Sequence, residues 1–189
     1  MTDINEAIQE PIEQAGKSKI NSKVALFVAI TATFMALCNV KDGNIVQAMS
    51  QAQAHAIDEW SYFQAKSTKQ SIAENSLSLL SFQHTAGTEE LIKKYQDEIN
   101  RYEKEKTDIK SQAEAYAKEY DDINLFDDQF DMTDALLTIA IAMLGITSLT
   151  QKRWLLYFSS IVALIGIILG LTAFMKISLH SDLISKILG

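Results

Sequence analysis

Few side chains in this sequence have the types and spacings that enzymes use for chemistry. The three histidines, His55, His84 and His180, are far apart along the chain. His55 and Glu59 would share one face of a helix, but two ligands do not complete a zinc site. The sequence contains no nucleophile elbow, phosphate-binding loop, dinucleotide glycine pattern or paired-cysteine motif. We therefore predict a protein that is not an enzyme, has no cofactor and has no identifiable small-molecule substrate.

A ladder of carboxylates is the main candidate for ion binding. Six of them fall within fourteen residues: Asp121, Asp122, Asp127, Asp128, Asp131 and Asp134. Calcium and magnesium accept such oxygen ligands, but the glycine turn and the ligand spacing of an EF-hand are missing. The simpler interpretation is a solvated segment whose carboxylates repel one another, so we predict no metal site. A divalent-ion site, or a site for a cationic partner, is the alternative.

The elements that carry these side chains alternate between apolar and charged composition. Charged residues are absent from 24–40, 135–151 and 154–175, whereas 18 of the 24 carboxylates fall within 41–131. Roughly 20 apolar residues in a helix cross the hydrocarbon layer of a bilayer. The third run, with 22 residues, meets this length, and the other two, with 17 each, are near its lower limit. The sequence therefore predicts three transmembrane helices.

Two of these runs have alternatives. The second would also suit a buried helix of a soluble bundle. The first would suit a cleaved signal peptide, because Lys17, Lys19 and Lys23 precede its apolar core. However, the leading segment is long and acidic, and Leu37 stands before Cys38, where lipoprotein cleavage requires a small residue. We therefore favour three intact spans.

Cations near the ends of the runs predict the orientation of the chain. Basic residues in short loops favour the cytoplasmic side. One side has Lys17, Lys19, Lys23, Lys152 and Arg153, and the other has Lys41, Lys118, Lys176 and Lys186. This majority of five to four places the N-terminal tail, 1–23, in the cytoplasm. Segment 41–131 and the C-terminal tail, 176–189, would then be periplasmic.

The third run carries a stripe of small residues at helical spacing: Ser159, Ala163, Gly166, Gly170 and Ala173. The two glycines, four residues apart, would let two helix backbones approach closely in lipid. We predict a helix–helix contact with another span of this chain or with a second copy. Transmembrane helices are also often rich in glycine without such a contact.

Polar side chains within the runs suggest a second class of function. No run contains a charge or a proline, which channels and transporters commonly use within the membrane. A pore would therefore need several copies, lined by Thr31, Thr33, Asn39, Thr138, Thr147, Ser148, Ser159 and Ser160. A small oligomeric channel or transport accessory protein is the alternative function.

Segment 41–131 has the composition of two long helices. It contains no proline and only two glycines. Gly87 predicts a helix end, and Thr88, followed by Glu89 and Glu90, predicts the next helix start. A heptad seam of nine positions follows: Ile92, Tyr95, Ile99, Tyr102, Lys106, Ile109, Ala113, Tyr116 and Tyr120. We expect an antiparallel helical hairpin, coiled-coil-like and joined near residues 83–88.

The first hairpin helix, expected from about residue 45 to 82, offers an Ala-rich partner for this seam. Its small residues are Ala48, Ala52, Ala54 and Ala56. An aromatic group follows, with Trp60, Tyr62 and Phe63. We expect this helix to be continuous, or nearly so, with the first span. The aromatic group is predicted to lie in the hairpin core, and a docking surface is the alternative.

Several blocks of the sequence resemble a known family. Residues 41–49 read KDGNIVQAM and residues 60–66 read WSYFQAK, while DQFD at 128–131 and KRW at 152–154 precede the second and third runs. Together they resemble bacterial inner-membrane proteins known only as a domain of unknown function, DUF4337. Phe63 stands where that family would have a tyrosine. The resemblance implies residence in the bacterial inner membrane over nearly the whole chain and supplies no activity.

Charge and composition limit the partners. The net charge of −7, without a cluster of Lys and Arg, argues against nucleic acid. The sequence thus predicts an all-α membrane protein with a long hairpin between its first two spans. Its expected partners are membrane lipid and either further copies of itself or another membrane protein. Its expected function is that of a scaffold or interaction module, with Trp60, Tyr62, Phe63, Gly166 and Gly170 as candidate contact residues.

Overall fold

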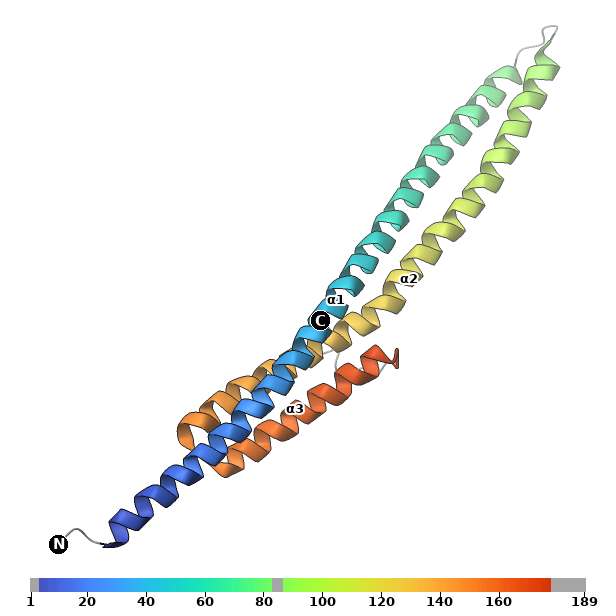
Figure 1. The fold of residues 1–189 in the computed structure, drawn as a ribbon. Coiled ribbons are helices and arrows are strands. Elements are labelled where there is room, and N and C mark those ends of the chain that lie inside the picture. Colours follow the sequence, from blue (N-terminus) through green and yellow to red (C-terminus); the bar gives the residue numbers. More distant parts are fainter. Residues whose placement is uncertain (1–3, 83–86, 178–189) are drawn as a thin grey trace. The chain divides into compact units, whose positions relative to one another are not determined.

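The computed structural model is all-helical in the residues that it describes, which are 4–82 and 87–177, with side chains described from residue 19 onward. Helix α1 spans Ile4–Leu80, helix α2 spans Thr88–Thr150 and helix α3 spans Arg153–Phe174 (Figure 1). All three helices are long and apolar enough to cross a membrane. The predicted all-α class is therefore confirmed.

The chain divides into two units, to which α1 and α2 each contribute. Unit 1 comprises Met1–Val46 and Asn124–Gly189, and unit 2 comprises Gln47–Ile123. In its described part, unit 1 contains the first part of α1, the last part of α2 and the whole of α3. Unit 2 is a hairpin in which α1 and α2 run antiparallel (Figure 1).

Both long helices pass through the predicted boundaries without a break. Helix α1 joins the first apolar run to the first hairpin helix, as expected. Helix α2 continues through the carboxylate ladder into the second run. The first hairpin helix, expected to end at about residue 82, ends at Leu80. Gly87 has φ +94°, a left-handed conformation that glycine adopts without strain, and α2 begins at Thr88 as predicted. Residues 83–86 of the expected connection lie outside the described part.

The hairpin core in unit 2 follows the predicted heptad seam. All nine seam positions of α2 are buried or half-buried, and Ile109 and Ala113 are the most deeply buried. Opposite them, Ala52 and Ala56 of α1 are buried. Ala54 is exposed, contrary to its expected place in the contact, because it lies two residues from each of these alanines and faces away.

The core of unit 1 has the same periodicity. Helix α2 buries six side chains that alternate by three and four: Phe130, Thr133, Leu137, Ala140, Leu144 and Thr147. Helix α3 buries its complete small-residue stripe against them. Helix α1 contributes Val24, Thr31 and Cys38, which are seven residues apart. Both units are therefore built on heptad packing.

A two-residue turn joins α2 to α3, and hydrogen bonds connect it to α1. Gln151 has φ 57°, and its backbone N–H donates to the carbonyl of Thr147 over 2.9 Å. The side-chain amide of Gln151 donates to Oδ1 of Asn21 over 2.7 Å, and the hydroxyl of Ser148 donates to the same oxygen over 3.1 Å. These bonds fix the start of α3 beside α1.

Candidate functional site

The two glycines of the stripe lie where α3 approaches the other helices of unit 1 most closely. A Cβ added to Gly166 would lie 2.8 Å from Cδ2 of Leu137. A Cβ added to Gly170 would lie 2.9 Å from Cε1 of Phe34 and 2.9 Å from Cγ2 of Thr133. These separations are shorter than real Cβ atoms make. The stripe therefore packs on α1 and α2 of its own chain.

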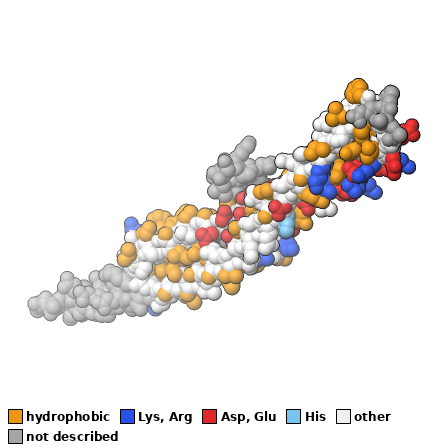
Figure 2. Space-filling model, turned by 90° about the horizontal axis from the view of Figure 1, so that it is seen from above, with side chains coloured by type: hydrophobic (Ala, Val, Ile, Leu, Met, Phe, Trp, Pro, Cys, Tyr) orange, Lys and Arg blue, Asp and Glu red, His pale blue; other side chains and the backbone are white. Residues whose placement is uncertain are grey.

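The other side of α3 is exposed and apolar. Figure 2 shows hydrophobic side chains over much of the visible surface of unit 1. On α3 they are Trp154, Tyr157, Phe158, Ile161, Leu164, Ile165, Ile168, Leu171 and Phe174. A face of this composition is unfavourable in water and suits contact with lipid.

Gln129 fastens α2 to the C-terminal end of α3. Its side chain is 6% exposed. The Nε2 amide lies 3.1 Å from the carbonyl oxygen of Leu169, 2.8 Å from Oγ1 of Thr172 and 3.4 Å from the carbonyl oxygen of Ile177. This side chain therefore joins α2 to the last turns of α3 and to the residues that follow it. Sequence analysis missed this residue, whose only signal was an uncharged polar side chain within the carboxylate ladder.

The hydroxyl groups expected to line a pore are mostly satisfied within their own helices. Thr147 and Ser159 are buried, and each donates to the backbone carbonyl four residues earlier, over 2.8 and 2.7 Å. Ser160 does the same over 2.8 Å. Thr33 is exposed and donates to the carbonyl of Ala29. These hydroxyls therefore need no aqueous channel to satisfy them.

A pair of carboxyl groups joins α1 to α2 outside the predicted spans, where Asp42 meets Asp127. Burial, with the negative charges of Asp42 and Asp131, raises the pKa of Asp127 to about 6. Burial, with the charge of Asp131, also raises the pKa of Asp42. The two side chains share a hydrogen bond that favours the proton on Asp127. Sequence analysis placed Asp127 in the ladder but missed Asp42, which comes from another helix.

The side chains of the carboxylate ladder differ in exposure. Asp121, Asp122 and Asp131 are exposed, whereas Asp128 and Asp134 are half-buried. Within residues 4–82 and 87–177, no group of three or more His, Cys, Asp and Glu side chains is arranged to hold a metal ion. The geometry therefore gives no support to the alternative of a divalent-ion site.

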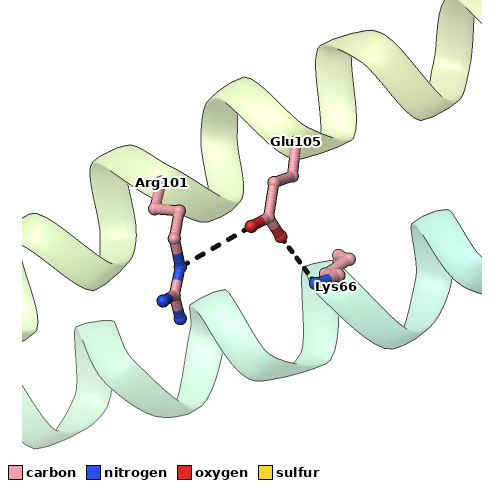
Figure 3. A network of polar contacts seen from close by, with 3 residues as sticks. All are labelled: Lys66, Arg101 and Glu105. Carbon is pink, nitrogen blue, oxygen red and sulfur yellow. Dashed lines mark ion pairs between the residues drawn. The ribbon is translucent and has the colours of Figure 1, made fainter.

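Three charged side chains, one from α1 and two from α2, form a polar network in the hairpin (Figure 3). Nζ of Lys66 lies 2.6 Å from Oε2 of Glu105, and Nε of Arg101 lies 3.6 Å from Oε1 of the same carboxylate. The ion pair with Lys66 lowers the pKa of Glu105 and raises that of Lys66. Aromatic rings surround this ammonium group, with Tyr62 and Tyr102 centroids at 5.0 and 5.5 Å. The contact between Lys66 and Glu105 thus joins α1 to α2.

The predicted aromatic group divides between the core and the surface of the hairpin. Phe63 is half-buried. Nζ of Lys106, the one charged seam residue, lies 5.5 Å from the centroid of the Phe63 ring. Trp60 packs edge-on against Phe63, with ring centroids 5.6 Å apart. Trp60 is nevertheless 38% exposed and Tyr62 is 50% exposed. The interpretation of all three as hairpin core is therefore wrong for Tyr62 and only partly right for Trp60.

A shallow pocket of about 210 Å³ lies beside Trp60 in unit 2. Helix α1 contributes Ala56, Ile57 and Trp60, and helix α2 contributes Ala117 and Tyr120. The small alanine side chains leave the hollow, and the larger side chains form its walls. The pocket is therefore mainly apolar and has an aromatic rim.

His55 is placed by a ring contact. It stacks on Tyr116 with ring centroids 5.0 Å apart and planes at 28°. His84 and His180 lie outside the described residues. The possible pairing of His55 with Glu59 acquires no third ligand among the side chains that the structure describes.

The comparisons with known proteins identify one family. DUF4337, a domain of unknown function, matches residues 20–176. The chain belongs to this family. No curated protein and no solved structure matches the DUF4337 chain.

The sequence blocks of this DUF4337 protein occupy helix contacts. In the first block, Ile45 and Met49 are buried. In the second, Phe63 and Lys66 face α2, whereas Trp60 remains partly exposed. Both blocks fall within the matched residues. In this DUF4337 chain, the blocks therefore serve mainly to join α1 to α2.

Proposed function

We propose that this DUF4337 protein is a non-enzymatic protein of the bacterial inner membrane whose hairpin binds a partner protein. The runs 24–40, 135–151 and 154–175 would be its spans. Three helices of sufficient length and apolar character support this proposal, as does the exposed apolar face of α3. In water such a face would favour aggregation, whereas in a bilayer it contacts acyl chains.

The observation that carries the binding role is the exposed aromatic and apolar group on the hairpin. Ile57, which is 58% exposed, adjoins Trp60 at the pocket of unit 2. Tyr62 is exposed on the same helix. Tryptophan and tyrosine are enriched at the centres of protein interfaces because they offer much contact area with little conformational entropy to lose. A second copy of this chain or another membrane protein would cover this surface.

Site-specific cross-linking in intact membranes tests this binding role. A photoreactive amino acid at Ile57 should give an adduct, and Trp60→Ala should reduce its yield. The mass of the adduct distinguishes a second copy from another protein. The same photoreactive residue at Leu79, also exposed on α1 in unit 2, serves as the matched control. Equal yields from the two positions, or no change with Trp60→Ala, would contradict the proposal.

The proposed orientation has a cytoplasmic N-terminus and a periplasmic hairpin. It rests on the majority of cations before the first run and in the turn at 151–153. The native cysteine, Cys38, is buried and gives little background in a labelling experiment. A membrane-impermeant maleimide should label Lys69→Cys in intact cells and Lys152→Cys only after lysis. The reverse pattern would invert the orientation.

The pore alternative receives no separate support from unit 1. Its buried hydroxyl groups bond to backbone carbonyls of their own helices, as in any tightly packed bundle. We therefore propose binding rather than conduction as the function.

A further inference from the structure

A basic pocket lies in unit 1 where α1 meets the N-terminal end of α3. Its volume is about 510 Å³. Three of its lining residues are cations: Lys19 and Lys23 from α1, one helical turn apart, and Arg153 from α3. The chain as a whole carries a net charge of −7, so this concentration of positive charge is a local exception.

The wall of the pocket is apolar and firmly packed. Leu156 lines it and is also part of a core cluster with Val24 and Leu144. Ile20 lines it and packs against the same cluster. Tyr157, which is 68% exposed, adds an aromatic ring with a hydroxyl group. The three cations thus lie around an apolar wall that is held in place by the core.

Among the side chains that the structure describes, no carboxylate lines this pocket. Toward the hairpin, the first carboxylate after Lys23 is Asp42, and the last one before Arg153 is Asp134. In a helix, each of these separations corresponds to roughly 28 Å, several times the screening length of about 8 Å at physiological salt. On the other side, Glu13 precedes Lys19 by six residues. Among the described side chains, none of the three cations takes part in an ion pair. Within the described part of the structure, no ion pair therefore competes with an anion for these cations.

A second pocket shows that this absence of carboxylates is not a general property of the surface. In unit 2, a pocket of about 410 Å³ also contains two lysines and an arginine. Three carboxylates stand beside those cations, and its charged lining is Glu90, Lys93, Lys94, Asp97, Glu98 and Arg101. The positive charge is balanced there, and in unit 1 it is not.

Exposed apolar residues continue from the basic pocket along both helices. Steps of four and three residues keep side chains on one face of a helix. From Lys23 such steps lead to Phe27 and Ile30 on α1, and from Tyr157 they lead to Ile161 and Leu164 on α3. All four of these apolar residues are exposed. The pocket therefore combines a site for an anion with a surface for hydrocarbon.

We propose that this pocket binds the phosphate headgroup of an anionic phospholipid. The inference rests on the proposed membrane residence, since the pocket then lies where the first and third spans begin. Arg153 would contact two phosphate oxygens, and Lys19 and Lys23 would act as point charges. The acyl chains would lie along the exposed apolar faces. A soluble phosphate would use only the cations, and a zwitterionic lipid would bring no net negative charge.

Native mass spectrometry of the full chain in mild detergent tests this inference. The probes are phosphatidylglycerol, phosphatidylcholine and glycerol 3-phosphate. Each basic residue near a negative charge contributes roughly fivefold in affinity, so three contribute on the order of 100-fold. Wild-type protein should therefore bind phosphatidylglycerol about 10 to 100 times more strongly than phosphatidylcholine. The variant Lys19→Gln/Lys23→Gln/Arg153→Gln should lose this preference.

Matched variants separate the site from the total charge of the chain. The variant Lys93→Gln/Lys94→Gln/Arg101→Gln removes the same three side-chain types from the balanced pocket and should keep the preference. The variant Lys19→Arg/Lys23→Arg keeps both positive charges and should also keep the preference. An unfolding transition of the triple Gln variant like that of the wild type excludes loss through misfolding.

Three outcomes would overturn the inference. In the first, the wild type binds phosphatidylglycerol and phosphatidylcholine equally. In the second, Lys19→Gln/Lys23→Gln/Arg153→Gln still prefers phosphatidylglycerol, and in the third, glycerol 3-phosphate competes at concentrations similar to those of the lipid. Recovery of the protein in the aqueous fraction of cells would instead refute the membrane residence. The cross-linking at Ile57 reports on the hairpin alone, so failure of the lipid site and failure of the binding role are distinguishable.

Discussion

Replacement of Gly170 by Ala should destabilise the packing of unit 1, whereas the same replacement at Gly145 should not. The new Cβ at Gly170 would lie 2.9 Å from Phe34 and from Thr133, whereas ordinary contacts begin at 3.4 Å. A neighbour must therefore move by about half an ångström in a well-packed interior, which costs about 1–3 kcal/mol. Thr133 cannot yield easily, since it is fully buried and its hydroxyl is bonded to the carbonyl of Gln129.

The gain in helix propensity partly offsets this cost. Gly→Ala in a helix contributes about 1 kcal/mol. Gly170→Ala should therefore change the free energy of unfolding by about 0 to −2 kcal/mol. At Gly145, nothing lies within 4 Å of the added Cβ, so Gly145→Ala should stabilise by about 1 kcal/mol. The two variants should differ by about 1–3 kcal/mol, a factor of about 5 to 150 in the unfolding equilibrium.

Unfolding of the purified protein in mixed micelles, followed by far-ultraviolet circular dichroism, measures this difference. Gly166→Ala should behave like Gly170→Ala, because its Cβ would approach Leu137 to 2.8 Å. Equal free energies of unfolding for Gly170→Ala and Gly145→Ala would refute the close-packing argument. A difference that depends on protein concentration would show that a second copy, rather than α1 and α2, packs against the stripe.

Three further variants test other contacts. Asp127→Asn should reduce the pH dependence of stability. The pKa of Asp127 is raised from 3.8 to about 6, so the native state binds this proton more tightly than the unfolded chain does. The resulting stabilisation is present at low pH and is lost as pH rises through about 6. Thermal unfolding at about pH 4.5 and about pH 7.5 measures it, and an unchanged dependence would contradict the proton on this pair. Gln129→Leu should lower the free energy of unfolding by about 1 kcal/mol in denaturant titrations, because the hydrogen bonds from its amide to half-buried acceptors on α3 are lost, and a neutral effect would refute this role. Glu105→Gln should lower the unfolding temperature slightly because it removes the charge that pairs with the half-buried ammonium group of Lys66, and an unchanged unfolding temperature would contradict a stabilising role of this pair.

The periodic part of this fold could be predicted from the sequence. The nine seam positions of α2 all face inward because side chains that alternate by three and four lie on one face of a helix. Lys106 looked like an exception, but its ammonium group lies over the ring of Phe63 while its stem joins the seam. Local composition likewise predicted the small-residue face of α3. It did not predict whether this face would pack on another span of the same chain or on a second copy.

Contacts that depend on the register between helices could not be predicted. Asp42 meets Asp127, and Gln129 meets Leu169 and Thr172, but no local pattern states which residue lies opposite which. The register depends on how α1 and α2 pair along their length. The first hairpin helix ends at Leu80, close to the expected residue 82, whereas Gly87 is the residue of positive φ directly before α2.

The contact of Gln129 with α3 has a consequence for the order in which the polypeptide is made. Helix α2 leaves the ribosome before Leu169, Thr172 and Ile177 have been translated, so its amide then lacks the acceptors that it meets in the finished protein. Docking of the last-made helix supplies them in a single event. A product truncated before Leu169 would keep this amide without those acceptors, and we expect proteases of quality control to remove it faster than the full-length chain.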